Sequence, residues 1–373
     1  MRKALSLKTN NVIVTNKSKK TIDSKRVLDD EENEVVSSKK AKYNETEQKK
    51  NNMIYELERR MEEKLQNPNR NEPSEKKQKN QDIRTWLQKR LSSTSSDRRR
   101  EKDPVILASD DYFFDMLQYM KSRQMVHRPP HDYMLKQKDL VNGMRVILID
   151  WLHDVITNYG LQTETLHLTV SIVDRFISVR TVMKEQLQLV GTSALLIASK
   201  YEESAKYVPK IDVFSIITQN TYSVDDILRM EMNILQQLDF VIVLPTALWF
   251  ASCFANRAQF TRKMKKTAQY LLNLSLLELD FLRFPPSSIA AAVICFSNIL
   301  SLTATVWSDD LQKDTGIEKN DFQDCLKQLE NLFVSAPENH QRMHKKYSSK
   351  ENDQVALLPV PRELFLSFQG EEI

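Results

Sequence analysis

Apolar residues recur at helical spacing from about residue 108 onward, but not before it. Residues 1–107 are dense in Lys, Glu, Asn, Ser and Gln, and their only aromatic residues are Tyr43, Tyr55 and Trp86. A segment with so little apolar surface cannot offset the entropy lost on ordering the chain. We therefore predict a disordered leader at 1–107 and a folded part after it.

The folded part divides into a leading helix and two groups of five helical segments. The leading helix is capped by Ser109 or Asp110 and runs to about Arg123. The other segments lie at about 140–158, 164–178, 183–201, 210–217 and 223–238, then at 245–257, 260–278, 286–302, 308–315 and 319–335. Apolar helices joined by short turns predict an all-α fold of two tandem five-helix bundles. We place the bundles at 108–243 and 244–336, and a C-terminal tail at 337–373.

The third helix of each group is rich in small residues. Gly191, Ala194 and Ala198 lie in the first group, and the second has Ala290-Ala291-Ala292. Small side chains let neighbouring helices approach closely, so each of these helices is predicted to be the centre of its bundle.

The segment 144–155 has apolar residues on nearly every side, which is typical of a buried helix. It also contains Arg145, and a buried guanidinium is costly unless an anion meets it. The next apolar helix offers Asp174. We predict a structural ion pair between Arg145 and Asp174.

Composition excludes several function classes. The five glycines are at least 17 residues apart, so no Gly-rich phosphate loop is present. The three cysteines, Cys253, Cys295 and Cys325, and the six histidines have no metal-ligand spacing. No apolar run has the roughly 20 residues of a membrane span, and we find no signal peptide. We expect no cofactor, no metal and no membrane partner.

The charge of the chain is unevenly divided. Residues 1–104 hold 27 of the 54 Lys and Arg but only 18 of the 50 Asp and Glu, so the leader carries +9 and the rest −5. A mildly acidic folded part argues against nucleic-acid binding.

Three stretches, in this order, resemble the cyclin box: 144–155, Leu187-Gln188-Leu189-Val190-Gly191, and Ala198-Ser199-Lys200-Tyr201-Glu202-Glu203. The resemblance covers about residues 108–360. Later segments, from Trp307 to Pro337 and in the tail, resemble A-type cyclins more than B-type ones. The resemblance to cyclins implies a regulatory subunit, not an enzyme. Such a subunit activates a cyclin-dependent kinase and recruits substrates in S phase or mitosis. A B-type cyclin is the alternative within the family.

The resemblance assigns two sets of residues to partner binding. Lys200 and Glu231 are expected to make polar contacts with the kinase. An apolar groove is expected to consist of Ile197, Tyr201, Leu235 and Ile242. The leading helix is expected to add contacts through Tyr112, Met116 and Tyr119. Arg-x-Leu segments of substrates and inhibitors are expected to dock on a partly exposed stripe, with Asp154 receiving the peptide arginine. That stripe consists of Met144, Ile147, Leu148, Trp151, Leu187 and Gln188. One loop, 204–209, is about two residues longer than is usual in A and B cyclins.

The chain also contains candidate degradation motifs and candidate nuclear-import signals. Arg2, Leu5 and Asn10 match a destruction box, which the anaphase ubiquitin ligase reads in this family, and Lys350-Glu351-Asn352 matches a KEN motif. Basic clusters at 17–20, 39–42 and 98–100 resemble nuclear-import signals. We expect a nuclear protein, with a cytoplasmic pool as a second location.

Two rival classes stay open at this point. A cyclin-fold transcription factor would bind nucleic acid, but it would need a zinc ribbon and a basic surface. An enzyme would need a catalytic constellation, and no Ser/His/Asp or Cys/His signature is present.

Overall fold

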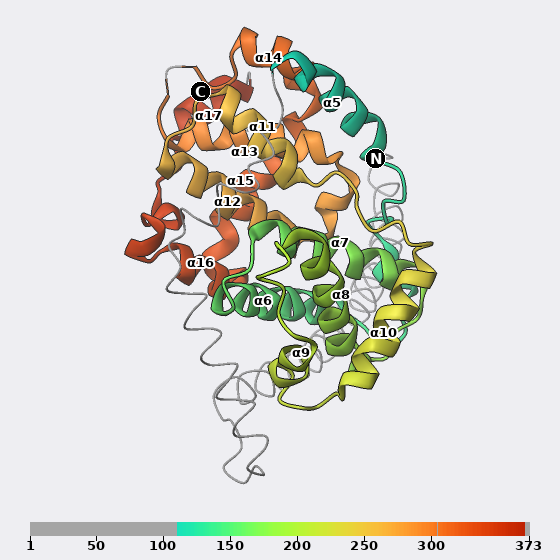
Figure 1. Cartoon of the computed structure of the whole chain (residues 1–373). Helices are drawn as coiled ribbons and strands as arrows, with labels where there is room; N and C mark the ends of the chain where they lie inside the picture. The colour runs from blue at the N-terminus through green and yellow to red at the C-terminus, as the bar shows by residue number, and fades with distance from the viewer. Residues whose placement is uncertain (1–109, 304, 370–373) are drawn as a thin grey trace, which may run out of the picture. The chain divides into compact units, whose positions relative to one another are not determined.

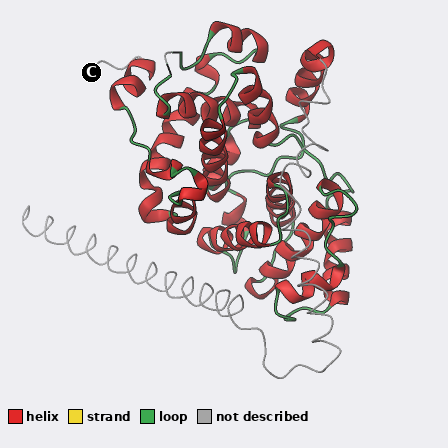
Figure 2. Ribbon diagram, turned by 60° about the vertical axis from the view of Figure 1, so that its left-hand side comes forward, coloured by secondary structure: helices red, strands yellow, loops and turns green. Residues whose placement is uncertain are grey.

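The structure is a computed structural model, and it describes residues 110–303 and 305–369. All regular secondary structure in these residues is helical, as Figures 1 and 2 show. The all-α prediction is therefore confirmed. The destruction box and the basic clusters lie outside the described residues.

The first bundle follows the leading helix α5 and the 3-10 turn η1. It contains α6, α7, α8, α9 and α10, and a second 3-10 turn, η2, comes before α8. The bounds are α5 Asp110–Arg123, η1 Tyr133–Lys136, α6 Asn142–Asn158, α7 Thr163–Val179, η2 Lys184–Gln186, α8 Leu187–Glu202, α9 Ile211–Ile217 and α10 Val224–Gln237.

The second bundle repeats this order, and the predicted tail forms further helices. The bounds are α11 Ala247–Arg257, α12 Arg262–Leu277, η3 Leu279–Arg283, α13 Pro286–Leu300, α14 Asp309–Thr315, η4 Lys319–Asp321, α15 Gln323–Asn339, α16 Gln341–Tyr347, η5 Lys350–Asn352, η6 Val355–Leu357 and α17 Arg362–Gln369. The segments predicted at 183–201 and 319–335 each begin with a 3-10 turn, η2 and η4, and the helix of the second continues through Pro337 to Asn339.

Local sequence signals account for several helix ends. Ser223 and Asp226 form a capping box at the start of α10, in which each side chain accepts from the other residue's backbone N–H. Pro286 occupies the first turn of α13, where its missing N–H costs nothing. Gly316 ends α14 in the left-handed region, at φ 58°.

The two small-residue helices are central, as predicted. Every residue of α13 is buried, and α8 is buried from Val190 to Ser199. A side chain at Gly191 would meet Leu148 of α6, because a Cβ atom there would lie 2.7 Å from the Leu148 Cδ1 atom. Glycine at this position therefore sets how closely α6 and α8 pack.

Arg145 and Asp174 form the predicted ion pair, and the pair is fully buried. The Arg145 Nε atom donates to Asp174 Oδ1 at 2.7 Å and its Nη2 atom donates to Oδ2 at 2.8 Å. The Tyr133 hydroxyl donates to the same carboxylate at 2.7 Å. The Arg145 Nη1 atom donates to the carbonyls of Leu276 and Leu277, at 2.9 and 3.1 Å. These carbonyls end α12, so one side chain of the first bundle caps a helix of the second.

A second contact between the bundles surrounds His153 of α6. The Asn273 amide of α12 donates to the Tyr347 hydroxyl at 2.9 Å and lies 3.4 Å from His153 Nε2. The Lys346 ammonium lies 3.1 Å from His153 Nδ1. Burial, together with the charge of Lys346, lowers the pKa of His153 to about 3. Burial lowers the pKa of His167 to about 4, against a smaller opposing effect of Asn273.

The Asp174→Asn variant tests the ion pair. It leaves the buried Arg145 charge without an anion, so we expect the free energy of unfolding to fall by about 3–5 kcal/mol. Urea denaturation measures this change. Asp139 is exposed, and Asp139→Asn should change stability by less than about 0.5 kcal/mol. Equal stability of the two variants would contradict the assigned role.

The buried histidines predict acid sensitivity. An unfolded histidine binds a proton below about pH 6.5, whereas His153 and His167 in the folded chain do not until about pH 3 and 4. The unfolded state thus binds more protons, and each histidine lowers the free energy of unfolding by up to about 1.4 kcal/mol per pH unit between pH 6.5 and 4. Urea denaturation from pH 7.5 to 5 should show this loss.

The test compares two variants. One is the double variant His153→Gln and His167→Gln, and the other is His131→Gln, a control at an exposed position. The buried double variant should have a flatter stability profile than the unmodified chain, and His131→Gln should not. An unchanged slope in the double variant would show that other groups cause the acid sensitivity.

Candidate partner-binding site

The Lys200–Glu231 pair joins α8 to α10 at the surface of the first bundle. The Lys200 ammonium donates to both carboxylate oxygens of Glu231, at 2.7 and 2.9 Å. The lysine side chain is half exposed, whereas the glutamate side chain is 12% exposed. The pair therefore holds a cation in reach of a partner while its carboxylate is mostly covered.

Large apolar side chains stand exposed beside this pair. Tyr201 follows Lys200 on α8, Leu228 and Met232 lie one turn apart on α10, and Phe240 follows that helix, with exposed fractions of 53, 41, 51 and 61%. Leu235 is half-buried one turn beyond Met232. We call these five residues, with Lys200 and Glu231, the α8–α10 face. Exposed apolar groups gathered around an ion pair are typical of a protein-binding surface.

The α8–α10 face differs from the predicted groove in its members. Tyr201 and Leu235 are accessible and Ile242 is half-buried, but Ile197 is 3% exposed and packs inside the bundle. The prediction for Ile197 is therefore corrected, because α10 packs along α8 and covers it. The sequence reading missed Leu228, Met232 and Phe240. The spacing of Leu228 and Met232, four residues apart, puts them on one side of a helix but does not indicate that this side is exposed.

The leading helix α5 exposes two of its three predicted contact residues. Tyr112 and Tyr119 are largely exposed, and Met116 is half-buried. The opposite side holds α5 in place: Phe113 is buried with the Arg257 guanidinium 4.3 Å from its ring centre. The Lys121 ammonium also donates to the Gly316 carbonyl at 2.9 Å. Figure 1 shows α5 beside α14 of the second bundle.

The stripe predicted to dock Arg-x-Leu peptides is buried in this structure. Its apolar members, Met144, Ile147, Leu148, Trp151 and Leu187, are all at most 5% exposed. The expected partial exposure is therefore wrong for these side chains. The physical reason is that α6 packs against α7, α8 and α12 together, which covers most of its circumference.

Gln188 is the polar member of that stripe. The Gln188 side chain is 7% exposed, and its Nε2 atom has no hydrogen-bond partner among the described residues. A buried amide donor without an acceptor is costly, so this atom is suited to a carbonyl that arrives from outside.

Asp154, the predicted acceptor for a peptide arginine, is half-buried at the end of α6. Burial raises the pKa of its carboxyl, and the nearby charges of Lys346 and Arg342 oppose that rise. Lys346 also donates to Thr157, one turn along α6. Two cations of α16 thus lie near the carboxylate that a peptide arginine would need.

The KEN segment is folded. Lys350–Asn352 forms η5, and the Asn352 amide donates to the Lys346 carbonyl at 2.9 Å. The following residue, Asp353, pairs with Lys266 of α12 at 3.0 Å. A degradation role for this motif stays a prediction, and it would require the turn to open.

Glu203, which directly precedes the long loop 204–209, is held by two hydrogen bonds. The Glu203 carboxylate accepts from the Gln162 backbone N–H at 2.7 Å and from the Thr165 hydroxyl at 2.9 Å. The loop then leads through Pro209 into α9.

Two further searches cover residues 110–303 and 305–369. There, no three His, Cys, Asp or Glu side chains are grouped as a metal site would need. None of the helices in this part combines the length and the apolar content needed to cross a membrane.

Comparison with known proteins shows which protein family the chain matches. Residues 115–243 match the family Cyclin, N-terminal domain, and residues 245–361 match Cyclin, C-terminal domain. The chain is 43% identical over 264 residues to the G2/mitotic-specific cyclin-A1 of Caenorhabditis elegans, which covers 70% of this chain and 54% of that protein. It is 37% identical over 268 residues to Cyclin-A2 of Gallus gallus, which covers 71% and 67%.

The fold has a solved counterpart. The X-ray structure of a viral cyclin from herpesvirus saimiri aligns with a TM-score of 0.52 and 18% identity, covering 59% of this chain and 97% of that one. The chain spans just over half the length of the nematode relative. Since both domains match in order and the curated relatives are A-type cyclins, the chain belongs to the cyclin family and to its A-type group.

Proposed function

We propose that this protein is the regulatory subunit of a cyclin-dependent protein kinase that acts in the cell cycle, in S phase or mitosis. Family membership supports the class of function, and the α8–α10 face supports the binding mode. That face, where exposed Tyr201 follows Lys200 on α8 and exposed Met232 follows Glu231 on α10, is the observation that carries the proposal.

The mechanism is differential binding. The chain supplies no catalytic group. It binds the active conformation of the kinase more tightly than the inactive one, and so shifts the kinase toward the active state. Apolar side chains on the α8–α10 face cover the kinase C-helix, and Lys200 and Glu231 make polar contacts at its edge. The kinase then forms its own Lys–Glu pair and carries out phosphoryl transfer.

A charge swap separates partner binding from an internal role of the ion pair. Lys200→Glu places two carboxylates together and should greatly reduce activation of the kinase. Adding Glu231→Lys restores an ion pair within the bundle but reverses the charges that a partner meets. We expect the double variant to fold normally and still to fail to activate, as measured by histone phosphorylation with a panel of recombinant cyclin-dependent kinases.

The control is Lys210→Glu, at an exposed position outside the α8–α10 face, which should activate normally. If the double swap restores activation, the pair serves only the bundle, where such pairs are worth about 0–1 kcal/mol. If the unmodified chain activates no kinase of the panel, the proposed function is wrong.

Substrate docking is the second part of the proposal. Arg-x-Leu segments of substrates and inhibitors bind beside α6, where the Gln188 Nε2 atom donates to a peptide carbonyl and Asp154 accepts from the peptide arginine. The unpartnered, buried Gln188 amide supports this site. The burial of Met144 and Trp151 means that these side chains must move when a peptide binds.

The Gln188→Leu variant tests docking without a large loss of packing. Leucine fills similar space and removes an unpaired donor, so stability should be unchanged or higher. We expect phosphorylation of an Arg-x-Leu substrate to fall several-fold, while a substrate without that motif is phosphorylated at the unmodified rate. Equal rates for both substrates in the variant would remove Gln188 from the docking site.

Turnover and location are proposed from the sequence alone. The destruction box at Arg2, Leu5 and Asn10 directs ubiquitin-dependent degradation through the anaphase ubiquitin ligase, and Lys350, Glu351 and Asn352 add a second signal. The basic clusters of the leader direct the chain to the nucleus.

A further inference from the structure

Two consecutive residues just after α10 have a left-handed backbone, and neither is a glycine. Asp239 has φ 50° and Phe240 has φ 57°. Among the described residues, Phe240 is the single phenylalanine, tyrosine or tryptophan with positive φ. This conformation is costly for a bulky residue, because its Cβ atom crowds the following carbonyl oxygen. The chain therefore bends at Phe240 in a way that the residue itself disfavours.

The end of α10 explains the conformation of Asp239 but not that of Phe240. The Phe240 N–H donates to the Leu235 carbonyl at 2.9 Å, and the Asp239 N–H donates to the Gln236 carbonyl at 3.3 Å. These two bonds form a Schellman motif, in which the residue at the position of Asp239 is left-handed and is usually a glycine. The motif does not require the next residue to be left-handed, so Phe240 must be held from elsewhere.

Arg175 of α7 holds the backbone that follows Phe240. Its Nη2 atom donates to the Val241 carbonyl at 2.6 Å, and its Nη1 atom donates to the Ile242 carbonyl at 3.1 Å. Arg175 is 3% exposed, and it forms no ion pair with a carboxylate in the part of the chain that the structure describes. A buried guanidinium is costly unless acceptors meet it, and these two carbonyls are the acceptors here. Arg175 and this short segment thus depend on each other.

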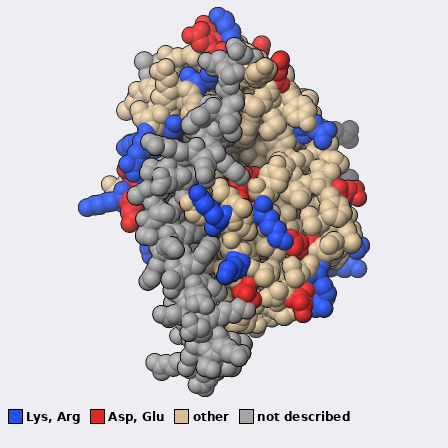
Figure 3. Space-filling view, viewed as in Figure 1, with Lys and Arg blue, Asp and Glu red and all other residues tan. Residues whose placement is uncertain are grey.

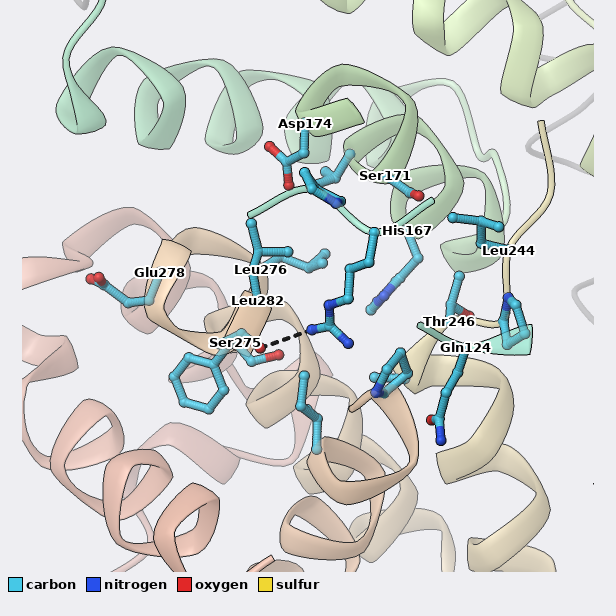
Figure 4. Close-up of a pocket in the computed structure, with 18 of the residues that line it drawn as sticks. Gln124, His167, Ser171, Asp174, Leu244, Thr246, Ser275, Leu276, Glu278 and Leu282 are labelled. Carbon is cyan, nitrogen blue, oxygen red and sulfur yellow. Dashed lines mark hydrogen bonds between the residues drawn. The ribbon is translucent and has the colours of Figure 1, made fainter. Parts of the chain in front are cut away.

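The connection between the two bundles continues along α7 after this contact. Ser171, one turn before Arg175, and Leu244 both line a cavity at the junction of the bundles. Figure 4 shows these two side chains on the same side of that cavity. The segment is therefore anchored on both sides of Phe240, by α10 before it and by α7 after it.

The Phe240 ring is exposed although its backbone is anchored. Its exposed fraction of 61% is the largest among the apolar residues of the α8–α10 face. Figure 3 shows the side of the molecule on which α10 is visible in Figure 1, and there Lys and Arg are interspersed with Asp and Glu among uncharged residues. A surface of mixed charge offers no strong field of one sign, so a partner is bound mainly through apolar anchors. A costly backbone conformation that presents an exposed aromatic ring is typical of a functional site.

We propose that Arg175 is a positioning residue for kinase binding, which holds Phe240 in its left-handed conformation and so directs the ring toward the kinase. The inference rests on the proposed function. Arg175 is buried and acts through the Val241 and Ile242 carbonyls, without touching the kinase itself. Holding the ring in place before binding reduces the entropy that is lost when the partner docks. Without the guanidinium, the segment relaxes and the ring leaves the α8–α10 face.

Hydrogen exchange of the full chain tests the hold of Arg175 on this segment without any partner. Arg175→Met keeps a side chain of similar length but removes the donors. The backbone N–H groups of Phe240 and Val241 should then exchange at least about ten-fold faster, because the turn opens more often. Arg180→Met, at an exposed position directly after α7, should leave their exchange unchanged. Unchanged exchange in Arg175→Met would overturn the proposal.

A double-mutant cycle tests whether Arg175 acts through Phe240. It measures the Kd for the kinase of the panel that the unmodified chain activates most strongly. Phe240→Ala should weaken binding about ten-fold or more, as loss of an aromatic anchor does. Arg175→Met should weaken it about five-fold in the unmodified chain but less than about two-fold in the Phe240→Ala chain, because effects that act through one side chain do not add. A merely structural role of Arg175 would give the same factor in both chains.

The outcomes separate this inference from the proposed function. If the kinase binds but the two effects add, or Arg175→Met binds as tightly as the unmodified chain, the role of Arg175 is wrong and the proposed function stands. If the unmodified chain activates no kinase, both are wrong. If Arg175→Met does not fold, Arg175→Lys replaces it, since lysine keeps the charge but cannot reproduce both bonds of the guanidinium. Arg175→Lys should change exchange and Kd in the same directions, and no change in either would overturn the proposal.

Discussion

The buried guanidinium of Arg145 ties the structure together. It satisfies both oxygens of Asp174 within the first bundle and two terminal carbonyls of α12 in the second. The net gain of such a pair over an apolar substitute is small, but removing one partner strands a charge in the core. Its geometry also fixes the end of α12 relative to α6. The polar cluster around His153, which joins α6 to Asn273 of α12, depends on that placement.

Features that depend on local chemistry could be predicted from the sequence. Three such features are the capping pair Ser223–Asp226, the close packing at Gly191 and the partner of Arg145. Each follows from a backbone or electrostatic requirement that a few residues in the sequence indicate. Helix bounds were predicted less well where a 3-10 turn intervened, as before α15. A hydrogen-bonded turn of three residues leaves little trace in an apolar pattern.

Exposure could not be predicted in the same way. Met144 and Trp151 lie on a helix that is apolar all round, and the pattern does not tell which side a partner will meet. Packing of α6 against three helices covers them. Leu228 and Met232 present the reverse case. They look like core residues in the sequence, yet they face outward because Ile227, Glu231 and Ile234 already fill the contact with α8. Which apolar residues remain on a surface depends on the assembled bundle.

The contact between Gly191 and Leu148 links the two surfaces that we propose for different partners. Helix α8 carries Lys200 and Tyr201 of the α8–α10 face, and α6 carries Asp154, the proposed acceptor for a peptide arginine. A Cβ atom at 191 would lie 2.7 Å from the Leu148 Cδ1 atom, so an added methyl group there would push α6 and α8 apart and displace both surfaces at once. The outward-facing side chains of these two helices can therefore vary, whereas the spacing between the helices cannot.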